Sequence, residues 1–375
     1  MHGLAIKAGA ALLAGSMLGA GAVSAAPVYR VVDLGFVNRF SPQSLALGVN
    51  ESGTVSGVSG VTAVTGNGGP PKTVGNGIPL AINDGGQVGG YRYEFRPGGS
   101  VPQAVVWNGS AVGALPGTTP SFGVGLNNAG QLSGTLQTES GAYRAFVWNG
   151  VDLQTLGTLG GASSYGTGIN DRGWLTGAAR TAAGEYHAFV WKGGDLQDLG
   201  TLGGDLPDSY GVAINEAGWV TGWSFRYDED DNPISHPLLW DGSSLRDLGV
   251  LRDGTSAYGY DLNNRGQVVG SSQLYLDLYG FGYGYGSPPS DAYAFLYDHG
   301  TLWNLDHLLV AADAGWNVVF ATGINDAGQI AASGCHPVLG CRALRLDPVA
   351  SVPLPPGSAL LLSGAGLLPA FRRKT

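Results

Sequence analysis

The segment Gly168 to Gly177 reads Gly-Ile-Asn-Asp-Arg-Gly-Trp-Leu-Thr-Gly, and it decides the fold because the chain repeats it. It is followed by Tyr-His-Ala-Phe-Val-Trp from Tyr186 to Trp191 and by Leu-Gln-Asp-Leu-Gly-Thr-Leu-Gly-Gly from Leu196 to Gly204. The Asn of the opening phrase recurs at Asn50, Asn83, Asn127, Asn170, Asn215, Asn263 and Asn325, with spacings of 33, 44, 43, 45, 48 and 62 residues. A period near 44 residues, made of short apolar pieces, indicates a repeat architecture.

Each repeat contains four short segments, which we expect to be β-strands. The first segment ends at the repeated Asn, and the second is a Gly-led apolar run such as Gly218 to Gly222. The third has the form Ala-Phe-Val-Trp, and the fourth has the form Leu-Gln-Asp-Leu-Gly. Short segments rich in β-branched and aromatic residues, separated by Asn-x-x-Gly or Asn-Gly turns, are typical of strands and hairpins. Residues 26–349 show no sustained helical period, so the sequence predicts an all-β repeat domain over this range.

Four antiparallel strands in about 44 residues match one blade of a β-propeller, with a β-solenoid as the alternative. Val31 to Gly35 is a fourth segment without the other three, and Ala343 to Leu346 is a third segment without a fourth. We therefore expect about seven four-stranded blades, with the N-terminal strand completing the last blade and removing exposed sheet edges. The first repeat is the weakest, because its third segment (61–66) is poor and its interval is only 33 residues.

The composition excludes several classes of protein. Glycine accounts for 65 of the 375 residues, but without a Gly-X-Y period, which excludes collagen. With 43% hydrophobic residues and nine Trp, the chain can bury a core and is not a disordered linker. The formal net charge is −9 and only 13% of residues are charged, so the basic footprint of a nucleic-acid-binding protein is missing.

Residues 1–25 have the features of a secretory signal peptide. His2 and Lys7 give a weakly positive start, and an apolar run extends from Ala8 to Val23. The small residues Val-Ser-Ala that end at Ala25 form a cleavage site, so we expect cleavage after Ala25. A buried N-terminal helix is the alternative.

Residues 350–375 form a tail of three parts. A Val-Pro-Leu-Pro-Pro motif precedes an apolar stretch from Gly357 to Phe371, and a basic cluster ends the chain. The apolar stretch is slightly short for a membrane-spanning helix, and the basic cluster would stay on the cytoplasmic side. This arrangement resembles the PEP-CTERM sorting signal, which an exosortase recognises and cuts, although Leu354 stands where that family has Glu. The residues that carry the resemblance are Val352, Pro353, Pro355, Arg372 and Arg373. A permanent anchor is the alternative.

The two cysteines of the chain, Cys335 and Cys341, flank a short segment that contains His336, Pro337 and Gly340. In an oxidising compartment, such a close pair predicts a disulfide that staples a hairpin. A metal site would need at least two more ligands than His336 can supply.

The repeats resemble the HAF-repeat family of bacterial extracellular proteins, named after the tripeptide seen here as His187-Ala188-Phe189. Gly168-Ile169-Asn170 and the segment Asp198 to Gly204 match the same family, and the resemblance covers Tyr29 to Pro348. Other repeats replace the His by Gln103, Arg144, Tyr293 and Arg342, so it is no shared catalytic group. The resemblance implies an extracellular repeat protein and carries no reaction with it.

The remaining polar residues do not form a recognisable active-site motif. His187 and His236 occupy one repeat position and are expected to be polar residues at a strand edge. Asp33, Asp198 and Asp247 share another position, which predicts a role in the blade. The residues that follow the repeated Asn, Asp171, Glu216, Asn264 and Asp326 among them, are expected to bond backbone amides nearby within their own turns.

Two insertions interrupt the repeat between the second and third segments. In the fifth repeat, Asp228, Asp230 and Asn232 alternate like the start of a Ca²⁺ loop, although a solvated acidic loop is the simpler interpretation. In the sixth repeat, the insertion carries the aromatic residues Tyr275, Tyr279, Phe281, Tyr283 and Tyr285 between glycines. Exposed Tyr rings suit stacking on sugars or proteins, and a flexible low-complexity loop is the alternative. Equivalent connections lie on one face of a propeller, so we expect the insertions side by side.

These features predict a secreted protein at the surface of a Gram-negative-type bacterium, with a transient inner-membrane anchor. We expect a non-catalytic binding or structural module of the envelope or exopolysaccharide matrix, processed by an exosortase-type enzyme. Exopolysaccharide or another envelope component is the expected partner, and no cofactor is expected apart from Ca²⁺ at the acidic insertion. The alternative is a polysaccharide-acting glycoside hydrolase or lyase, which needs two carboxylates about 5–10 Å apart. Acids outside the repeat pattern cluster at 228–231 and at Asp277.

Overall fold

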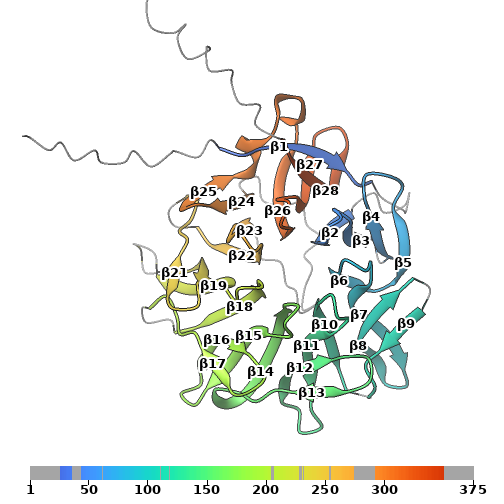
Figure 1. Ribbon diagram of the computed structural model, residues 1–375, viewed down its shortest axis with the longest axis vertical. Coiled ribbons are helices and arrows are strands. Elements are labelled where there is room, and N and C mark those ends of the chain that lie inside the picture. The colour runs from blue at the N-terminus through green and yellow to red at the C-terminus, as the bar shows by residue number, and fades with distance from the viewer. Residues whose placement is uncertain are drawn as a thin grey trace, which may run out of the picture.

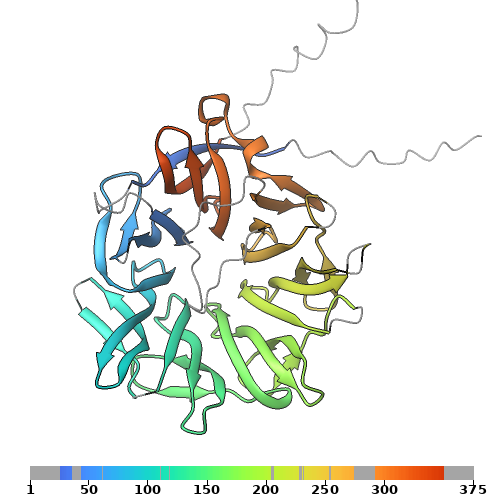
Figure 2. The same cartoon turned by 180° about the vertical axis from the view of Figure 1, so that it is seen from behind.

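The computed structural model of the chain describes residues 26–35, 44–60, 62–109, 111–117, 119–203, 207–227, 230, 232–252, 255–273 and 292–349. Within these ranges the chain forms seven four-stranded antiparallel sheets arranged around a central axis (Figures 1 and 2). The same ranges contain two short 3₁₀ helices and no α-helix. The fold is therefore the seven-bladed β-propeller that the repeat arithmetic predicts.

The blades follow the order of the chain. Blade 1 consists of β2 (Ser44–Val49), β3 (Val55–Ser59), β4 (Thr62–Gly66) and β5 (Lys72–Asn76). Blade 2 consists of β6 (Ile78–Ile82), β7 (Val88–Arg96), β8 (Gly99–Asn108) and β9 (Ala111–Ala114). Blade 3 consists of β10 (Ser121–Leu126), β11 (Leu132–Gln137), β12 (Tyr143–Trp148) and β13 (Leu153–Thr155). Blade 4 consists of β14 (Gly160–Ile169), β15 (Leu175–Thr181), β16 (Tyr186–Trp191) and β17 (Leu196–Asp198).

The remaining blades complete the ring. Blade 5 consists of β18 (Ser209–Ile214), β19 (Val220–Tyr227), β20 (Pro233–Trp240) and β21 (Leu245–Asp247). Blade 6 consists of β22 (Ala257–Leu262), β23 (Val268–Ser272), β24 (Tyr293–Asp298) and β25 (Thr301–Asn304). The helices η1 (Leu305–Leu308) and η2 (Ala311–Asp313) lead to blade 7, which contains β26 (Asn317–Ile324), β27 (Ile330–His336) and β28 (Gly340–Val349).

Blade 7 takes its outer strand from the other end of the chain. The strand β1 (Val28–Asp33) pairs antiparallel with β28, from Val28 opposite Val349 to Asp33 opposite Leu344. In Figure 1 the blue β1 lies along the outer edge of the orange-red last blade. The predicted closure by the N-terminal strand is thus confirmed, and β28 does not present a free edge along this stretch.

The core lies between neighbouring blades, because several third strands carry a Phe that is buried against the preceding blade. Phe146, Phe189 and Phe295 occupy the same repeat position and are fully buried. In one such cluster, Ala145 and Val147 of blade 3 pack with Leu175 and Phe189 of blade 4. Burying this apolar surface between sheets is the main force that holds the blades together.

Blade 1 is complete although its third and fourth segments are weak strand formers. The glycines of this region allow close packing against blade 2, where Trp107 is almost fully buried. A Cβ atom added to Gly75 would lie 2.7 Å from Nε1 of Trp107. Small residues that look like poor strand formers are therefore required by the neighbouring blade.

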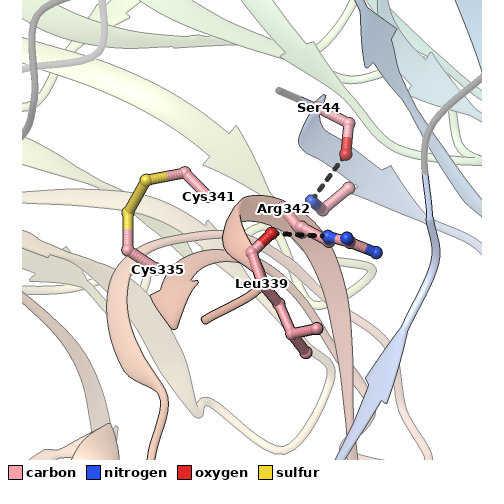
Figure 3. The surroundings of a disulfide bond; sticks show 6 residues. Ser44, Cys335, Leu339, Cys341 and Arg342 are labelled. Carbon is pink, nitrogen blue, oxygen red and sulfur yellow. Dashed lines mark hydrogen bonds between the residues drawn. A yellow bond between two sulfur atoms is a disulfide. The ribbon is translucent and has the colours of Figure 1, made fainter. Parts of the chain in front are cut away.

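A disulfide joins Cys335 and Cys341 across the hairpin between β27 and β28, as predicted (Figure 3). The adjacent Arg342 donates from Nε to the carbonyl of Leu339 within the hairpin. The backbone N–H of Ala343 donates to the hydroxyl of Ser44 at the start of blade 1 (2.9 Å). The stapled hairpin thus continues directly into the contact between the last and first blades.

Helices of the length and apolarity needed to cross a bilayer do not occur among the residues that the structure describes. The predicted signal peptide and the predicted sorting tail lie outside those residues.

Candidate functional site

The first strands of the blades line a central channel with two different ends. Each first strand runs toward its repeated Asn, so the turns to the second strands share one face, which we call the Asn face. Because neighbouring strands are antiparallel, the second-to-third connections lie at the other end, on the hairpin face. The two predicted insertions connect β19 to β20 and β23 to β24, which are equivalent strands of adjacent blades. Their flanking strands therefore end on the hairpin face.

The seven repeated Asn residues form a closed ring of hydrogen bonds on the Asn face. Each side chain donates its amide N–H to the main-chain carbonyl of the equivalent Asn in the next blade, over 2.9–3.1 Å. Each side-chain oxygen accepts the backbone N–H four residues ahead, over 2.8–3.1 Å. The glycines that complete these turns have φ between 73° and 83°, which explains the Asn-x-x-Gly pattern. The repeated Asn therefore stabilises both its own turn and the contact with the next blade.

A second ring surrounds the first and corrects the sequence prediction of bonds within single turns. The side chain after each Asn accepts the backbone N–H of its equivalent in the preceding blade, over 2.7–3.0 Å. The members of this outer ring are Glu51, Asp84, Asn128, Asp171, Glu216, Asn264 and Asp326. The prediction was wrong because the amide that donates is 33–62 residues away along the chain for six of the bonds, and 275 residues away for the seventh.

The outer ring gives the Asn-face mouth a carboxylate-rich lining around a cavity of about 270 Å³. Burial raises the pKa of Glu51, and the nearby carboxylates of Asp326 and Asp84 add to the rise, while the N–H of Asp326 opposes it. All seven side chains of this ring already accept a backbone amide. Their arrangement accounts for the assembly of the blades, and it singles out no acid and base pair.

The middle of the channel holds a cavity of about 230 Å³ whose lining residues are mainly aliphatic residues and glycines. Two residues before the repeated Asn, six blades place Gly or Ala, namely Gly48, Ala81, Gly125, Gly168, Ala213 and Gly323. Blade 6 instead places Asp261 there, and its carboxylate accepts the N–H groups of Leu262 (2.9 Å) and Ile324 (2.8 Å). Burial raises the pKa of Asp261 to about 7 in spite of these two donors. Asp261 therefore links blade 6 to blade 7 with a carboxyl group in the channel wall.

The hairpin-face end of the channel is apolar and aromatic. The residue five positions before each Asn lies on the first strand of its blade, and these residues are Leu45, Ile78, Phe122, Tyr165, Tyr210, Tyr258 and Phe320. Five of them belong to one cluster with the apolar side chains of the channel wall. The two ends of the channel are thus chemically opposite.

A continuous series of aromatic rings extends from this end over blades 3 to 6. We call it the aromatic crescent, and it consists of Tyr143, Tyr165, Tyr186, Tyr210, Trp223 and Tyr258. Successive ring centroids are 5.3–5.8 Å apart, and three of the five contacts are stacked. The five tyrosines are half-buried, whereas Trp223 is only 5% exposed and anchors the series. Sequence reasoning missed the crescent, because its tyrosines lie on first and third strands of different repeats and its Trp223 lies on a second strand.

The histidines of the third strand pair with the aspartates of the fourth. Nδ1 of His187 lies 2.9 Å from the Asp198 carboxylate, and Nδ1 of His236 lies 3.0 Å from that of Asp247. Arg226 also contacts Asp247 (2.6 Å). Burial alone would raise the pKa of Asp247. Hydrogen bonds from His236, from the N–H of Gly249 and from Arg226 outweigh this effect and lower the pKa to about 2. These pairs join strands within a blade, in keeping with the role predicted from their shared repeat positions.

The structure describes only some of the predicted insertion residues. Asp230 and Asn232 are exposed, whereas Asp228 and all five aromatic residues from Tyr275 to Tyr285 lie outside the described residues. Among the residues that are described, no group of three or more His, Cys, Asp or Glu side chains could hold a metal ion. The calcium hypothesis and the stacking hypothesis for these insertions stay predictions.

The geometry defines the chain as a closed seven-bladed β-propeller with an aromatic face and a carboxylate-rich face. Residues 102–338, more than half of the chain, match the sequence pattern of the family described as protein of unknown function DUF3466. The chain belongs to this family. No curated protein matches the sequence.

Several solved structures are similar in fold. One is the β-propeller domain of the Trilobed protease from Pyrococcus furiosus, with TM-score 0.49 and 9% identity, covering 84% of this chain and 100% of that chain. Another is the acylaminoacyl peptidase of Pyrococcus horikoshii, with TM-score 0.45 and 11% identity, covering 78% of this chain and 50% of that chain. A third is the six-bladed Aleuria aurantia lectin, with TM-score 0.33 and 10% identity, covering 88% and 98%. Similarity this low says nothing about what the chain binds or catalyses.

Proposed function

We propose that the chain is a secreted, non-catalytic binding module of a bacterial envelope or exopolysaccharide matrix, with a polysaccharide as its partner. The observation that carries this proposal is the contrast between the two ends of the channel. The Asn face uses its polar side chains to join the blades, whereas the hairpin face presents half-buried tyrosines. Partly exposed tyrosines offer apolar area and a hydroxyl at low cost in conformational entropy, which suits binding.

The ends of the chain support the location of this module. Residues 1–25 have the order of a signal peptide, and residues 350–375 have the order of a PEP-CTERM-like sorting tail. Removing both would take away basic residues and no acidic ones, so the mature protein would be more acidic than the full chain. An exosortase-type enzyme would release the protein from a transient inner-membrane anchor. The HAF-like repeats fit the same extracellular setting.

Mass spectrometry of the secreted protein tests the processing. We expect a mature N-terminus at Ala26 and no peptide that contains Arg372. Recovery of Arg372 from the secreted form would contradict removal of the tail, and would favour a protein that keeps it.

A glycan-binding screen of the secreted protein tests the function. We expect binding to at least one polysaccharide, and a second protein that lacks residues 274–287 reports whether the Tyr-rich insertion takes part. Binding that survives this deletion removes the insertion from the site. A protein that binds no glycan would be a purely structural component, and the proposal would fail.

The same samples test the absence of catalysis. We expect the polysaccharide to keep its chain length after incubation with the protein. Shortening of the polymer that disappears when Asp228, Asp230 or Asp277 is replaced by Asn would establish a glycoside hydrolase or lyase instead.

A further inference from the structure

We propose that the aromatic crescent is the binding surface itself, and that its ligand is an uncharged polysaccharide chain lying across blades 3 to 6. This inference rests on the proposed function and names the site and the class of ligand. The residues of the crescent lie on strands of blades 3 to 6, and neither insertion is part of the site.

The crescent is continuous across three blade boundaries. Tyr143 at the start of β12 stacks on Tyr165 of the next blade, with centroids 5.5 Å apart and planes at 27°. Tyr186 at the start of β16 stacks on Tyr210 of the following blade in the same way, at 5.8 Å and 29°. A surface that crosses several blades fits an extended polymer better than a single small ligand, which usually occupies an enclosed pocket.

The rings are held in place by the blades. Tyr210 stacks on the buried Trp223 at 5.3 Å, and Trp223 in turn meets the edge of Tyr258 at 5.5 Å. The backbone N–H of Tyr186 donates to Asp208 over 2.7 Å. Rigid aromatic side chains lose little entropy on binding, so they are the residues expected to dominate the affinity of such a surface.

The polar groups along the crescent suit hydroxyl groups. Burial raises the pKa of Tyr165, and its hydrogen bond with Tyr186 adds to the rise, so the Tyr165 hydroxyl stays protonated and its oxygen can accept a hydrogen bond from a ligand. Arg180 is exposed and stacks over Tyr186, with Cζ 5.2 Å from the ring centroid. The parts of these rings that their stacked neighbours leave exposed, together with the nearby hydroxyl and guanidinium groups, match the two sides of a sugar ring, one with C–H bonds and one with hydroxyls.

The charges near the crescent disfavour a polyanion. Arg180 lies over Tyr186, but Glu185 directly precedes that tyrosine and the Asp208 carboxylate accepts its backbone N–H, and the chain as a whole has a formal net charge of −9. An anionic polymer would need several cations along its path, as phosphate-binding surfaces show. A neutral polysaccharide needs none, and it is therefore the ligand that this surface fits.

The experiment measures binding of the secreted protein to soluble xylan, glucomannan and mixed-linkage β-glucan by affinity electrophoresis and calorimetry. Alginate serves as the anionic probe, and a proline-rich peptide serves as a competing class of aromatic-binding ligand. We expect Tyr186→Ala and Tyr210→Ala each to weaken binding of a neutral glycan by about tenfold. Tyr186→Phe, which keeps the ring, should stay within about threefold of the wild type.

Phe95→Ala is the matched control, because Phe95 is an aromatic residue at the hairpin-face end of β7 in blade 2 and is 89% exposed. It should leave binding unchanged. Thermal melting checks that each variant folds, and Tyr210→Leu replaces Tyr210→Ala if the smaller side chain destabilises the blade.

The outcomes separate the two proposals. If the wild type binds a neutral glycan and the Tyr186 and Tyr210 variants bind equally well, the crescent is not the site, but the proposed function stands. Binding of alginate alone or of the peptide alone overturns the inference about the ligand. If the wild type binds no glycan at all, both proposals fail.

Discussion

The side chain of Asn325 donates a hydrogen bond to the main-chain carbonyl of Asn50, at a distance of 3.0 Å and across 275 residues of sequence. This bond joins blade 7 to blade 1, and it is identical in kind to the six bonds that join successive blades. The propeller is therefore closed twice. The Asn ring closes it at the channel, and β1 closes it at the rim.

Replacing a member of the Asn ring should cost far more than replacing its neighbour in the outer ring. Asn127→Ala removes the bond to Asn170 and the acceptor for the N–H of Gln131, both at a buried position. We expect the free energy of unfolding to fall by about 3 kcal/mol, because buried backbone groups lose their partners. Asn128→Ala, at an exposed position, should cost less than about 1 kcal/mol. Urea unfolding of both variants measures the difference, and equal losses would mean that the Asn ring does not hold the blades.

Removing β1 should open the propeller without unfolding every blade. A chain that begins at Ser44 loses the ladder to β28 and exposes the edge of that strand, and the core of blade 7 loses Tyr29, which is 1% exposed in the full chain. We expect a thermal midpoint lower by more than about 10 °C and association that grows with protein concentration. A chain that begins at Val28 keeps the strand and serves as control. A shortened protein that stays monomeric with an unchanged midpoint would show that the Asn ring alone closes the fold.

The sequence predicted the blades because their strands depend on local patterns, but it could not predict what joins them. The Asn-x-x-Gly phrase marks each turn, since the amide oxygen of Asn170 bonds the N–H of Trp174 within the same turn. The other half of the same amide bonds Asn215 in the next blade, and no local pattern reveals that partner. For the same reason the outer-ring side chain of Asp171 looks like a turn residue, although the amide it accepts is that of Asn128 in the preceding blade.

The aromatic crescent could not be predicted from a single repeat, because it joins residues from different repeat positions in neighbouring blades. A weak trace of it exists in the sequence, because Tyr165, Tyr210 and Tyr258 all stand five residues before the repeated Asn. Tyr143 and Tyr186 occupy a different position, at the start of the third strand. They meet the first group only because the third strand of one blade packs beside the first strand of the next. That contact is set by the angle between blades, which the sequence does not display.

Reducing the disulfide should weaken blade 7 locally and leave the ring closed. Cys335 and Cys341 are six residues apart and sit opposite each other in an existing β-ladder. A loop this short contributes about 2 kcal/mol through the unfolded state. We expect a loss of this size in the unfolding free energy, measured in denaturant with and without reductant. The double variant Cys335→Ser, Cys341→Ser should show the same loss and no response to reductant. Unfolding of the protein on reduction alone would contradict this local role.

Asp261 should make the propeller less stable as the pH rises toward neutrality. Burial raises the pKa of Asp261 to about 7 in the folded chain, with Asp326 and Glu51 adding to the rise, whereas an unfolded Asp titrates near 3.9. Below about pH 4 both states are protonated and the group has no effect on stability. Between about pH 4 and 7 the unfolded chain loses its proton first, so the free energy of unfolding falls as the pH rises through this window.

The variant Asp261→Asn tests this prediction, because its side chain cannot titrate. We therefore expect the stability of the wild type relative to this variant to decline from pH 4 to 7 and to level off above that range. The exposed variant Asp195→Asn serves as control for the other carboxylates. Denaturant unfolding at one-unit pH steps provides the measurement, and a difference between wild type and Asp261→Asn that stays constant across the window would show that the carboxyl group in the channel wall is ionised throughout.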